Sequence, residues 1–430
     1  MSKTASYITL GCKLNYAETS TYERGFINAG YESVPWNKGA DLFVINTCSV
    51  TEHADKKSRN IIRKLHKVSP DATIVVTGCY AQLKKTEVEA LDGVSLVFGA
   101  NEKSSLVDTT LDYIAQRTES KPTTTLQEET FAAYSSGEER TRSFLKVQDG
   151  CDNFCAYCTV PYARGRSRSI SIDKAVSEAK KIAASGVKEI VLTGVNTGDF
   201  GRKTGESFLD LLKALNDVQG IERYRISSIE PNLLTDDIVD WIASGTKFLP
   251  HFHIPLQSGS DTILKDVGRK YTTEFFANKI AYIREKMNPK PGELNADGSK
   301  KPDVFFGIDV IAGLPGETDE LFLETYNFLR DRVKPAFIHI FPYSRRAGTR
   351  SAVRKDQVQD CVKTKRVAML EDLCKTLNEE FIASQKGVRE QVLFEEDNND
   401  GVMSGYTGNY IKVDRPWDPT LAGKIVEVTL

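Results

Sequence analysis

No apolar run in the 430-residue sequence approaches the length needed to span a membrane. The opening segment, MSKTASYITL, lacks the charged and then apolar build of a secretory signal. Neither sign of charge dominates, and a net charge of -2 gives no global attraction to nucleic acid. We therefore expect a cytoplasmic protein without membrane association, in which any contact with nucleic acid uses a local patch.

A disulfide framework is also not expected, because cytoplasmic cysteines are normally metal ligands or reduced thiols. The chain has eight of them. Hydrophobic content of 40% and charged content of 27% are ordinary for a globular protein, and the length predicts two or three domains.

The most informative stretch is 150–158, GCDNFCAYC, in which Cys151, Cys155 and Cys158 are separated by three and then two residues. Three thiolates on one short loop can point at a single compact centre. Iron–sulfur clusters normally take four protein ligands. No fourth cysteine lies nearby, so one iron would stay open to a ligand. Tyr157 can lie against a bound ring. A zinc loop or a set of buried thiols is the alternative.

This stretch resembles the signature of the radical SAM superfamily. The resemblance implies a four-iron cluster held by Cys151, Cys155 and Cys158, whose free iron chelates the amino and carboxylate groups of S-adenosylmethionine. In that superfamily electron transfer cleaves S-adenosylmethionine to a deoxyadenosyl radical. The resemblance therefore also implies an electron donor, such as flavodoxin or ferredoxin, as a partner.

The first segment, about residues 1–115, alternates short apolar runs with helical patterns, which predicts a parallel α/β sheet. The expected strands are residues 7–10, 42–45 and 74–76. Each is followed closely by a cysteine, namely Cys12, Cys48 and Cys79. Because the loops after parallel strands share one edge of the sheet, we expect these thiols to form a second three-cysteine metal site. Three unrelated buried thiols are the alternative. His53 and His66 are possible additional ligands without a supporting pattern.

The segments GCKLN (11–15), NTCSVT (46–51) and TGCYAQ (77–82) resemble the N-terminal domain of the methylthiotransferases. The resemblance implies a second four-iron cluster on Cys12, Cys48 and Cys79, with an open iron at which the added sulfur is presented. The sequences KLN and CSVT are most similar to the branch acting on threonylcarbamoyladenosine in tRNA.

After a linker at 116–140, residues 141–345 carry six apolar runs with helical patterns between them, which predicts a parallel barrel or part-barrel. The expected strands are residues 144–147, 189–192, 224–226, 253–256, 305–308 and 337–340. The resemblance implies the partial (β/α)6 barrel of radical SAM enzymes, with its site at the carboxyl ends of the strands.

Polar residues and glycines follow those strand ends. By resemblance, Gly194 and its neighbour Asn196 lie near the methionine amino group, while Glu230 and Gln257 lie near the nucleoside. Turn formation and a solvated carboxylate are the alternatives.

Arg164, Arg166 and Arg168 alternate after the cysteine loop and would share one face of an extended segment. Such a face, Arg168 included, could take the S-adenosylmethionine carboxylate or RNA phosphate. A solvated strand face is equally compatible.

The loop at 288–302 carries three lysines and departs from the shorter family connection. Residues 346–385 form a helical connection, and from 341 to 375 nine basic residues face four acidic ones. Within it Cys374 belongs to an apolar stripe, and Cys361 has no partner spacing. Neither is expected to be a ligand.

The last segment, 386–430, has expected strands at 391–394, 410–413 and 424–428 and a hairpin signal at 399–401. A small antiparallel β-barrel fits this pattern. It resembles the TRAM domain, an RNA-binding barrel of tRNA-modifying enzymes. Five basic residues face eight acidic ones there, so the alternative to phosphate binding is contact of Tyr406 or Trp417 with an unstacked base.

Together these features predict methylthiolation of threonylcarbamoyladenosine next to the anticodon of tRNA. Radical C–H activation and sulfur insertion would precede methyl transfer from a second S-adenosylmethionine. A change of substrate to isopentenyladenosine in tRNA, or to an aspartate of a ribosomal protein, is the nearest alternative. An alternative of another class is a non-catalytic iron–sulfur or zinc protein, either an electron carrier or a scaffold.

Overall fold

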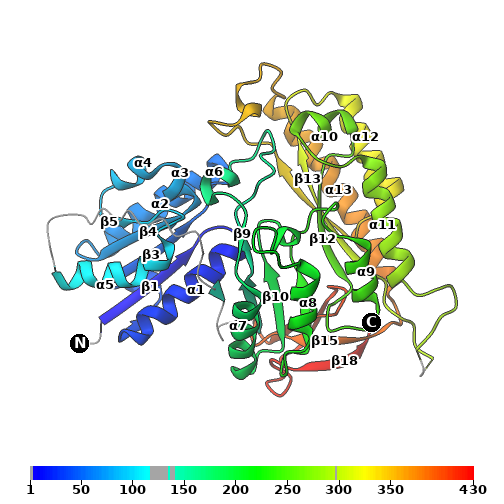
Figure 1. The fold of residues 1–430 in the computed structure, drawn as a ribbon, viewed down its shortest axis with the longest axis horizontal. Coiled ribbons are helices and arrows are strands. Elements are labelled where there is room, and N and C mark those ends of the chain that lie inside the picture. The colour runs from blue at the N-terminus through cyan, green and yellow to red at the C-terminus, as the bar shows by residue number, and fades with distance from the viewer. Residues whose placement is uncertain (1–2, 117–133, 136–140, 296–297) are drawn as a thin grey trace.

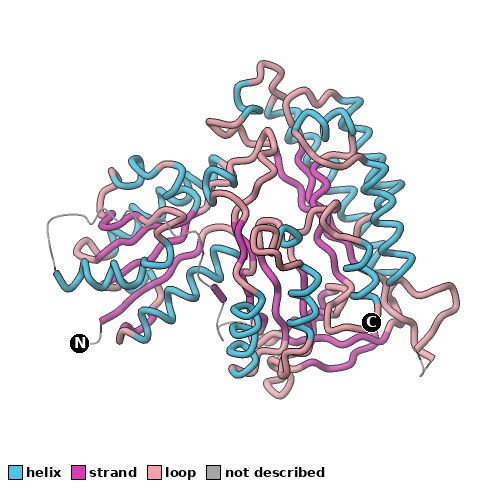
Figure 2. Tube along the Cα trace, in the orientation of Figure 1, coloured by secondary structure: helices cyan, strands magenta, loops and turns pink. Residues whose placement is uncertain are grey.

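The computed structural model describes residues 3–116, 134–135, 141–295 and 298–430 (Figure 1), so most of the expected linker at 116–140 lies outside the described residues. Within the described part of the chain, no helix combines the length and the apolar character that crossing a membrane requires. Figure 2 shows the N-terminal sheet and its helices at the left, and a larger body that contains the remaining strands and helices at the right.

The N-terminal part is a five-stranded parallel sheet in the order β2-β1-β3-β4-β5. Its strands are β1 (Lys3–Thr9), β2 (Tyr31–Ser33), β3 (Leu42–Thr47), β4 (Thr73–Gly78) and β5 (Val94–Val97). Its helices are α1 (Lys13–Asn28), α2 (Glu52–Val68), α3 (Cys79–Leu83), α4 (Lys85–Glu89) and α5 (Leu106–Gln116). The three predicted strands are confirmed. Strand β3 is buried at every position, as expected of a parallel strand covered on both faces.

The central part contains six parallel strands, and all six were predicted. They are β7 (Arg142–Lys146), β10 (Glu189–Thr193), β11 (Arg223–Ile226), β12 (His251–Gln257), β13 (Phe305–Ala312) and β14 (Phe337–Pro342). Strands β7, β10 and β11 pair in one sheet and β12 to β14 in another, and single bridges join β11 to β12. The outer edge of β7 pairs with β6 (Tyr134–Ser135). The pattern predicted a parallel barrel or part-barrel, and the structure has the partial (β/α)6 barrel that the family resemblance implied.

Helices cover the outside of these strands (Figure 1). They are α7 (Ile172–Ala184), α8 (Phe208–Asn216), α9 (Asp236–Ala243), α10 (Asp261–Val267), α11 (Thr273–Met287) and α12 (Asp319–Asn327). The long helix α13 (Asp360–Ser384) packs on β14, so the predicted helical connection is part of the barrel wall.

The C-terminal part is a four-stranded antiparallel sheet in the order β17-β16-β15-β18. Its strands are β15 (Arg389–Phe394), β16 (Val402–Tyr406), β17 (Lys412–Pro416) and β18 (Ile425–Thr429). The sheet lies against one end of the barrel (Figure 1). There Arg225 donates to the carbonyl oxygens of Thr407 (2.6 Å) and Gly408 (2.8 Å).

A buried ion network joins the N-terminal part to the barrel. The Glu18 carboxylate of α1 is fully buried and contacts Lys103 (2.7 Å), Lys146 of β7 (2.7 Å) and Arg164 (3.1 Å). Arg164 and Lys146 also bind Asp149 at 3.0 and 2.8 Å. Burial alone would raise the pKa of Glu18, but the three surrounding cations hold it well below its usual range.

We expect Glu18→Ala to destabilise the protein by about 3–5 kcal/mol, because buried Lys103 would lose its carboxylate partner and buried Lys146 and Arg164 would keep only the Asp149 carboxylate. The measurement is the urea unfolding of the purified protein, with Glu89→Ala on the exposed end of α4 as the matched control. The control should change stability by no more than about 0.5 kcal/mol. Since the folded pKa of Glu18 lies below the unfolded value, its contribution is present above that unfolded value and is lost as pH falls further. Equal stabilities for the two variants would contradict the role of the network.

Candidate metal centre

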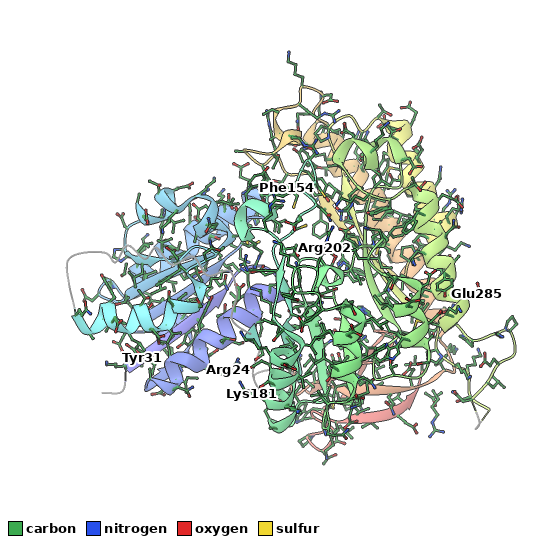
Figure 3. The ribbon with its side chains drawn as sticks, in the orientation of Figure 1. Arg24, Tyr31, Phe154, Lys181, Arg202 and Glu285 are labelled. Carbon is green, nitrogen blue, oxygen red and sulfur yellow. The ribbon has the colours of Figure 1, made fainter. Side chains whose placement is uncertain are left out.

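The three-cysteine loop at 151–158 lies between β8 (Gln148–Asp149) and α6 (Val160–Arg164), at the carboxyl end of β7. Gly150 opens the loop at φ +72°, and a Cβ atom there would lie 2.1 Å from the carbonyl oxygen of Arg166. No other residue fits that position. Phe154 takes a left-handed conformation, and Figure 3 places it between the N-terminal part and the barrel. The loop therefore faces the junction between these two parts.

Each sulfur of this loop accepts one hydrogen bond of 3.4 Å: Asn153 N–H to Cys151, an Arg269 N–H to Cys155 and Val160 N–H to Cys158. Donors of this kind stabilise a negative sulfur. Burial raises the pKa of Cys151 to about 11 and that of Cys158 to about 12. The loop is thus suited to thiolates that a bound metal deprotonates.

Cys12, Cys48 and Cys79 gather at one edge of the N-terminal sheet. They follow β1, β3 and β4, which are adjacent parallel strands. The Cys48 sulfur lies 3.3 Å from the position that a Cβ atom on Gly11 would take, beside Cys12. Burial raises the pKa of Cys48 to about 11, and the neighbouring Cys79 and Cys12 thiolates raise it further. The predicted convergence of these three thiols is therefore present in the structure.

Positive charge surrounds this second triplet. Burial raises the pKa of Cys79, whereas Arg164 and Lys103 lower it. Arg164 also donates to Asn15 Oδ1 at 2.6 Å, and Asn15 Oδ1 accepts from the Cys12 thiol at 3.3 Å. Such surroundings favour a bound group of negative charge.

The spacing of the cysteines argues against zinc. One zinc ion would hold its thiolates about 3.8 Å apart in tetrahedral geometry. Among the described residues, the histidine, cysteine and acidic groups compact enough for a single ion do not include either triplet. The donor set and the wider spacing fit an iron–sulfur cluster at each site.

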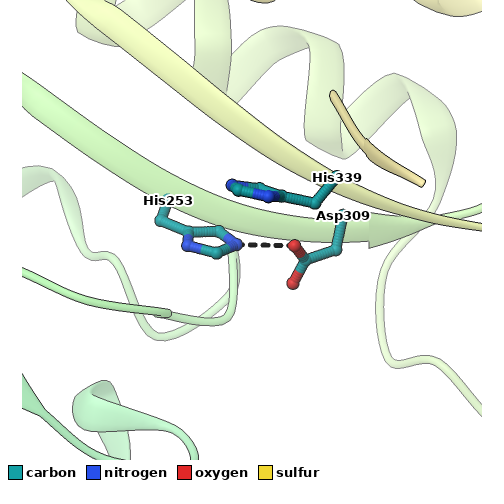
Figure 4. Close-up of side chains that lie close together, drawn as sticks. All are labelled: His253, Asp309 and His339. Carbon is teal, nitrogen blue, oxygen red and sulfur yellow. Dashed lines mark hydrogen bonds and ion pairs between the residues drawn. The ribbon is translucent and has the colours of Figure 1, made fainter. Parts of the chain in front are cut away.

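The compact group is His253, Asp309 and His339 on β12, β13 and β14 (Figure 4). A ring nitrogen of His253 lies 2.6 Å from Asp309 Oδ1, and the two imidazoles stack with centroids 4.7 Å apart. Burial lowers the pKa of His339 to about 4 and keeps it neutral near pH 7. The sequence did not reveal this group, although His253 and His339 lie within predicted strands and Asp309 directly follows one.

A chain of hydrogen bonds runs from the cysteine loop to the strand ends. Gln148 Nε2 donates to the Gly150 carbonyl at 2.8 Å, and its Oε1 accepts from Asn196 N–H at 2.9 Å. Asn196 Oδ1 accepts from Glu230 N–H at 3.2 Å. The Glu230 carboxylate pairs with Arg269, which also donates to Cys155. Asn196 and Glu230 are thus brought together just beyond the carboxyl ends of β10 and β11.

Gly194, Gln257 and Tyr157 complete the set of predicted contacts. A Cβ atom on Gly194 would lie 2.9 Å from Gln148 Oε1, so this strand end admits only glycine without rearrangement. Gln257 ends β12, buried, with φ of 70°. Tyr157 is half-buried and packs on the apolar cluster that includes Ile311 and Val267. All three lie on the loops at the carboxyl end of the barrel.

The prediction that Arg164, Arg166 and Arg168 share one face is wrong. Residues 160–164 form the short helix α6, which ends at Gly165. Arg164 is consequently buried, Arg166 is exposed, and Arg168 binds Asp149 at 3.2 Å. Through this contact Arg168 holds Asp149, the residue that precedes the cysteine loop.

Two side chains of the site were not found from the sequence. Gln148 lies two residues before the 150–158 stretch, so its position in the sequence could have indicated a role at the site. Arg269 is separated from Cys155 by more than a hundred residues, and nothing in the sequence indicated that the two lie together. His53 is exposed on α2 and His66 packs over Gly93, so neither joins the cysteines. Cys374 is buried and Cys361 exposed, away from both triplets, as predicted.

A cavity of ≈ 570 Å³ lies where the N-terminal sheet, the barrel and the C-terminal sheet meet. Its lining includes Cys12, Lys13, Arg142, Arg225 and the rings of Tyr7, Tyr16, Phe144 and Tyr410. It therefore brings a cysteine of the second triplet, three basic groups and several aromatic rings to one space.

Comparison with known proteins agrees with this geometry. The family model described as Uncharacterized protein family UPF0004 matches residues 4–99, and that of the Radical SAM superfamily matches residues 145–329. The Threonylcarbamoyladenosine tRNA methylthiotransferase MtaB of Bacillus subtilis (strain 168) is 39% identical over 99% of this chain and 93% of its own. The tRNA-2-methylthio-N(6)-dimethylallyladenosine synthase of Carboxydothermus hydrogenoformans is 32% identical over 98% of this chain and 95% of its own.

Among solved structures, the radical S-adenosylmethionine methyltransferase TsrM from Kitasatospora setae, with cobalamin and a [4Fe-4S] cluster bound, has the same fold. The TM-score is 0.59 at 14% identity, over 82% of this chain and 74% of that one. The barrel and its three-cysteine loop therefore define this chain as a radical SAM protein. It belongs to the radical SAM methylthiotransferase family, in the MtaB branch. Its cofactors are accordingly S-adenosylmethionine and [4Fe-4S] clusters.

Proposed function

We propose that this protein methylthiolates threonylcarbamoyladenosine next to the anticodon of tRNA. The observation that carries the proposal is the presence of two separate cysteine triplets, one at each side of the junction between the N-terminal sheet and the barrel. The near full-length similarity to an MtaB protein supports the substrate.

In this proposal Cys151, Cys155 and Cys158 hold one four-iron cluster, and Cys12, Cys48 and Cys79 hold the other. When bound, the first cluster with S-adenosylmethionine supplies the one-electron chemistry that activates a C–H bond, and the second presents sulfur. The chain keeps these tasks apart by placing each triplet on a different part of the fold. Hydrogen bonds from Asn153, Val160 and Arg269 stabilise the negative sulfurs of the first triplet.

Residues at the barrel's strand ends would orient S-adenosylmethionine. Burial raises the pKa of Glu230, and its pairing with Arg269 opposes that shift. We assign Glu230 and Gln257 to the nucleoside, and Gly194 with Asn196 to the methionine amino group. Tyr157 would lie against the bound adenine.

The other assignments concern the rest of the chain. We propose segments at 1–115, 116–140, 141–345, 346–385 and 386–430, the last acting as a TRAM-like RNA-binding unit. A flavodoxin- or ferredoxin-type donor would supply electrons in the cytoplasm. The RNA-binding role of the C-terminal unit is supported by the Tyr406 ring at the end of β16, which has the Arg142 guanidinium 4.7 Å from its centroid.

The test is mass spectrometry of tRNA nucleosides from cells with and without the gene. We expect cells without it to accumulate threonylcarbamoyladenosine lacking the methylthio group. Loss of methylthio-isopentenyladenosine instead would favour the substrate of the 32% identical relative. Unchanged tRNA would overturn the proposal and direct attention to the ribosomal-protein aspartate. A reduced, reconstituted enzyme that forms no deoxyadenosine would support the electron-carrier alternative.

A further inference from the structure

Lys13 directly follows Cys12 and opens helix α1, so it lies between the second cysteine triplet and the cavity. Its side chain lines the cavity and is exposed. Within the described residues it has no hydrogen bond or ion pair. An ammonium group in such a place is accessible to a ligand and is not committed to the fold.

The other two cations that line the cavity, Arg142 and Arg225, already have partners within the fold. Arg142 forms an ion pair with Glu395 at 2.6 Å. Arg225 pairs with Glu189 at 2.8 Å and donates to two backbone carbonyls of the C-terminal sheet. These contacts hold the C-terminal sheet on the barrel and give each of the two side chains a partner within the fold. Lys13 is therefore the cation that can turn to a bound group.

The electrostatics of the cavity favour an anion. No carboxylate stands among its lining residues. Arg142 and Arg225 are each paired with a glutamate, whereas a carboxylate beside Lys13 would pair with an ammonium that has no partner among the described residues. An apolar group there would leave the ammonium unpaired.

The chemistry of adenine relates this position to the substrate. The C2 carbon, which receives sulfur in the proposed reaction, and the N6 substituent flank the same N1 edge of the ring. A group that presents sulfur to C2 must therefore lie close to the protein side chains that contact the N6 substituent. Lys13 follows one of the sulfur-presenting cysteines and carries a point charge on a long flexible stem, so it meets this condition.

We propose that Lys13 binds the carboxylate of the threonylcarbamoyl substituent and thereby selects an anionic N6 group over an apolar one. This inference rests on the proposed function, because it assumes that the modified adenine enters this cavity. Lys13 is then a specificity-determining residue of the substrate site. The nearby rings of Tyr16 and Phe144, packed edge to face at 5.7 Å, offer an apolar wall for the base itself.

The experiment compares two anticodon stem-loop RNAs that differ only in the substituent: threonylcarbamoyladenosine and its methyl ester, which lacks the charge. Dissociation constants are measured at fixed salt with the anaerobically reconstituted holoenzyme. For the unaltered enzyme we expect the ester to bind about 10- to 100-fold more weakly. In Lys13→Met this ratio should fall to about one, whereas Lys13→Arg should retain most of it. Lys203→Met, on an exposed loop, removes the same charge elsewhere and should keep the original ratio.

Iron is counted in every variant, because Lys13 adjoins a predicted cluster ligand. If Lys13→Met loses iron, the comparison of Lys13→Arg with Lys13→Gln replaces it. A Lys13→Met or Lys13→Gln protein that keeps the original ratio overturns the inference. An unaltered enzyme that methylthiolates the RNA but shows a ratio of one also overturns it, while leaving the proposed function intact. An unaltered enzyme that neither binds nor methylthiolates this RNA overturns the proposed function itself.

Discussion

Replacing Cys155 by alanine is expected to lower the iron content from about eight to about four per chain and to abolish cleavage of S-adenosylmethionine. The variant loses the buried sulfur that Arg269 approaches at 3.4 Å, and two thiols on a short loop do not hold a four-iron cluster. The measurement combines iron analysis with the deoxyadenosine formed under reductant. Cys361→Ala, which removes an exposed thiol outside both triplets, is the control and should match the unaltered enzyme.

Persistence of deoxyadenosine formation in Cys155→Ala at the original rate would contradict the assignment of the barrel triplet. A preparation that contains zinc in place of iron would contradict it as well. Because Cys155 is buried, its loss also affects packing, so the iron count must be read on folded protein.

Replacing Cys79 by alanine is expected to have the complementary effect. The iron content should again fall by about four per chain, but deoxyadenosine should still form, and no methylthio group should appear on the tRNA. The physical reason is that the barrel loop keeps all its sulfurs and its donors, while the sheet-edge triplet loses a thiol whose pKa Arg164 and Lys103 lower against the effect of burial. Both products are measured in one reaction by mass spectrometry.

The informative comparison is between the two cysteine variants. If Cys79→Ala abolishes deoxyadenosine as completely as Cys155→Ala does, the triplets do not serve separate tasks. If Cys79→Ala still methylthiolates tRNA at the original rate, the sheet-edge triplet is not the source of sulfur. Cys374→Ala is a control for loss of a buried thiol, since that residue accepts from Ile338 N–H in the core.

Much of the fold followed from apolar patterning. Strands β3 and β4 are buried on both faces, so their continuous runs of valine, isoleucine and phenylalanine were readable in the sequence. Strand β2 has only three residues, and β16 contains Gly405 and polar residues, so neither run was long or apolar enough to be recognised. Strand β2 pairs with β1, from which helix α1 separates it, and β16 pairs with its direct neighbours β15 and β17.

The cysteines of the candidate site were predictable because their chemistry requires a recognisable residue type at fixed spacing. The charged residues that support the site could not be predicted. Sequence reading places ionised groups at the surface, but Glu18, Lys146 and Arg164 are all buried. Glu18 lies 128 residues from Lys146 and 146 from Arg164, so only the folded chain reveals that they compensate one another.

That network has a consequence for how a substrate is received. Arg164 contacts Asn15, three residues from Cys12, and Asp149, two residues from Cys151. Directional contacts of this kind tolerate little sliding, unlike apolar surfaces. The Arg164 guanidinium consequently links the segments that carry the two cysteine triplets and helps to fix the distance between them. The spacing between the two triplets is therefore a property of the folded chain itself, present before any substrate binds.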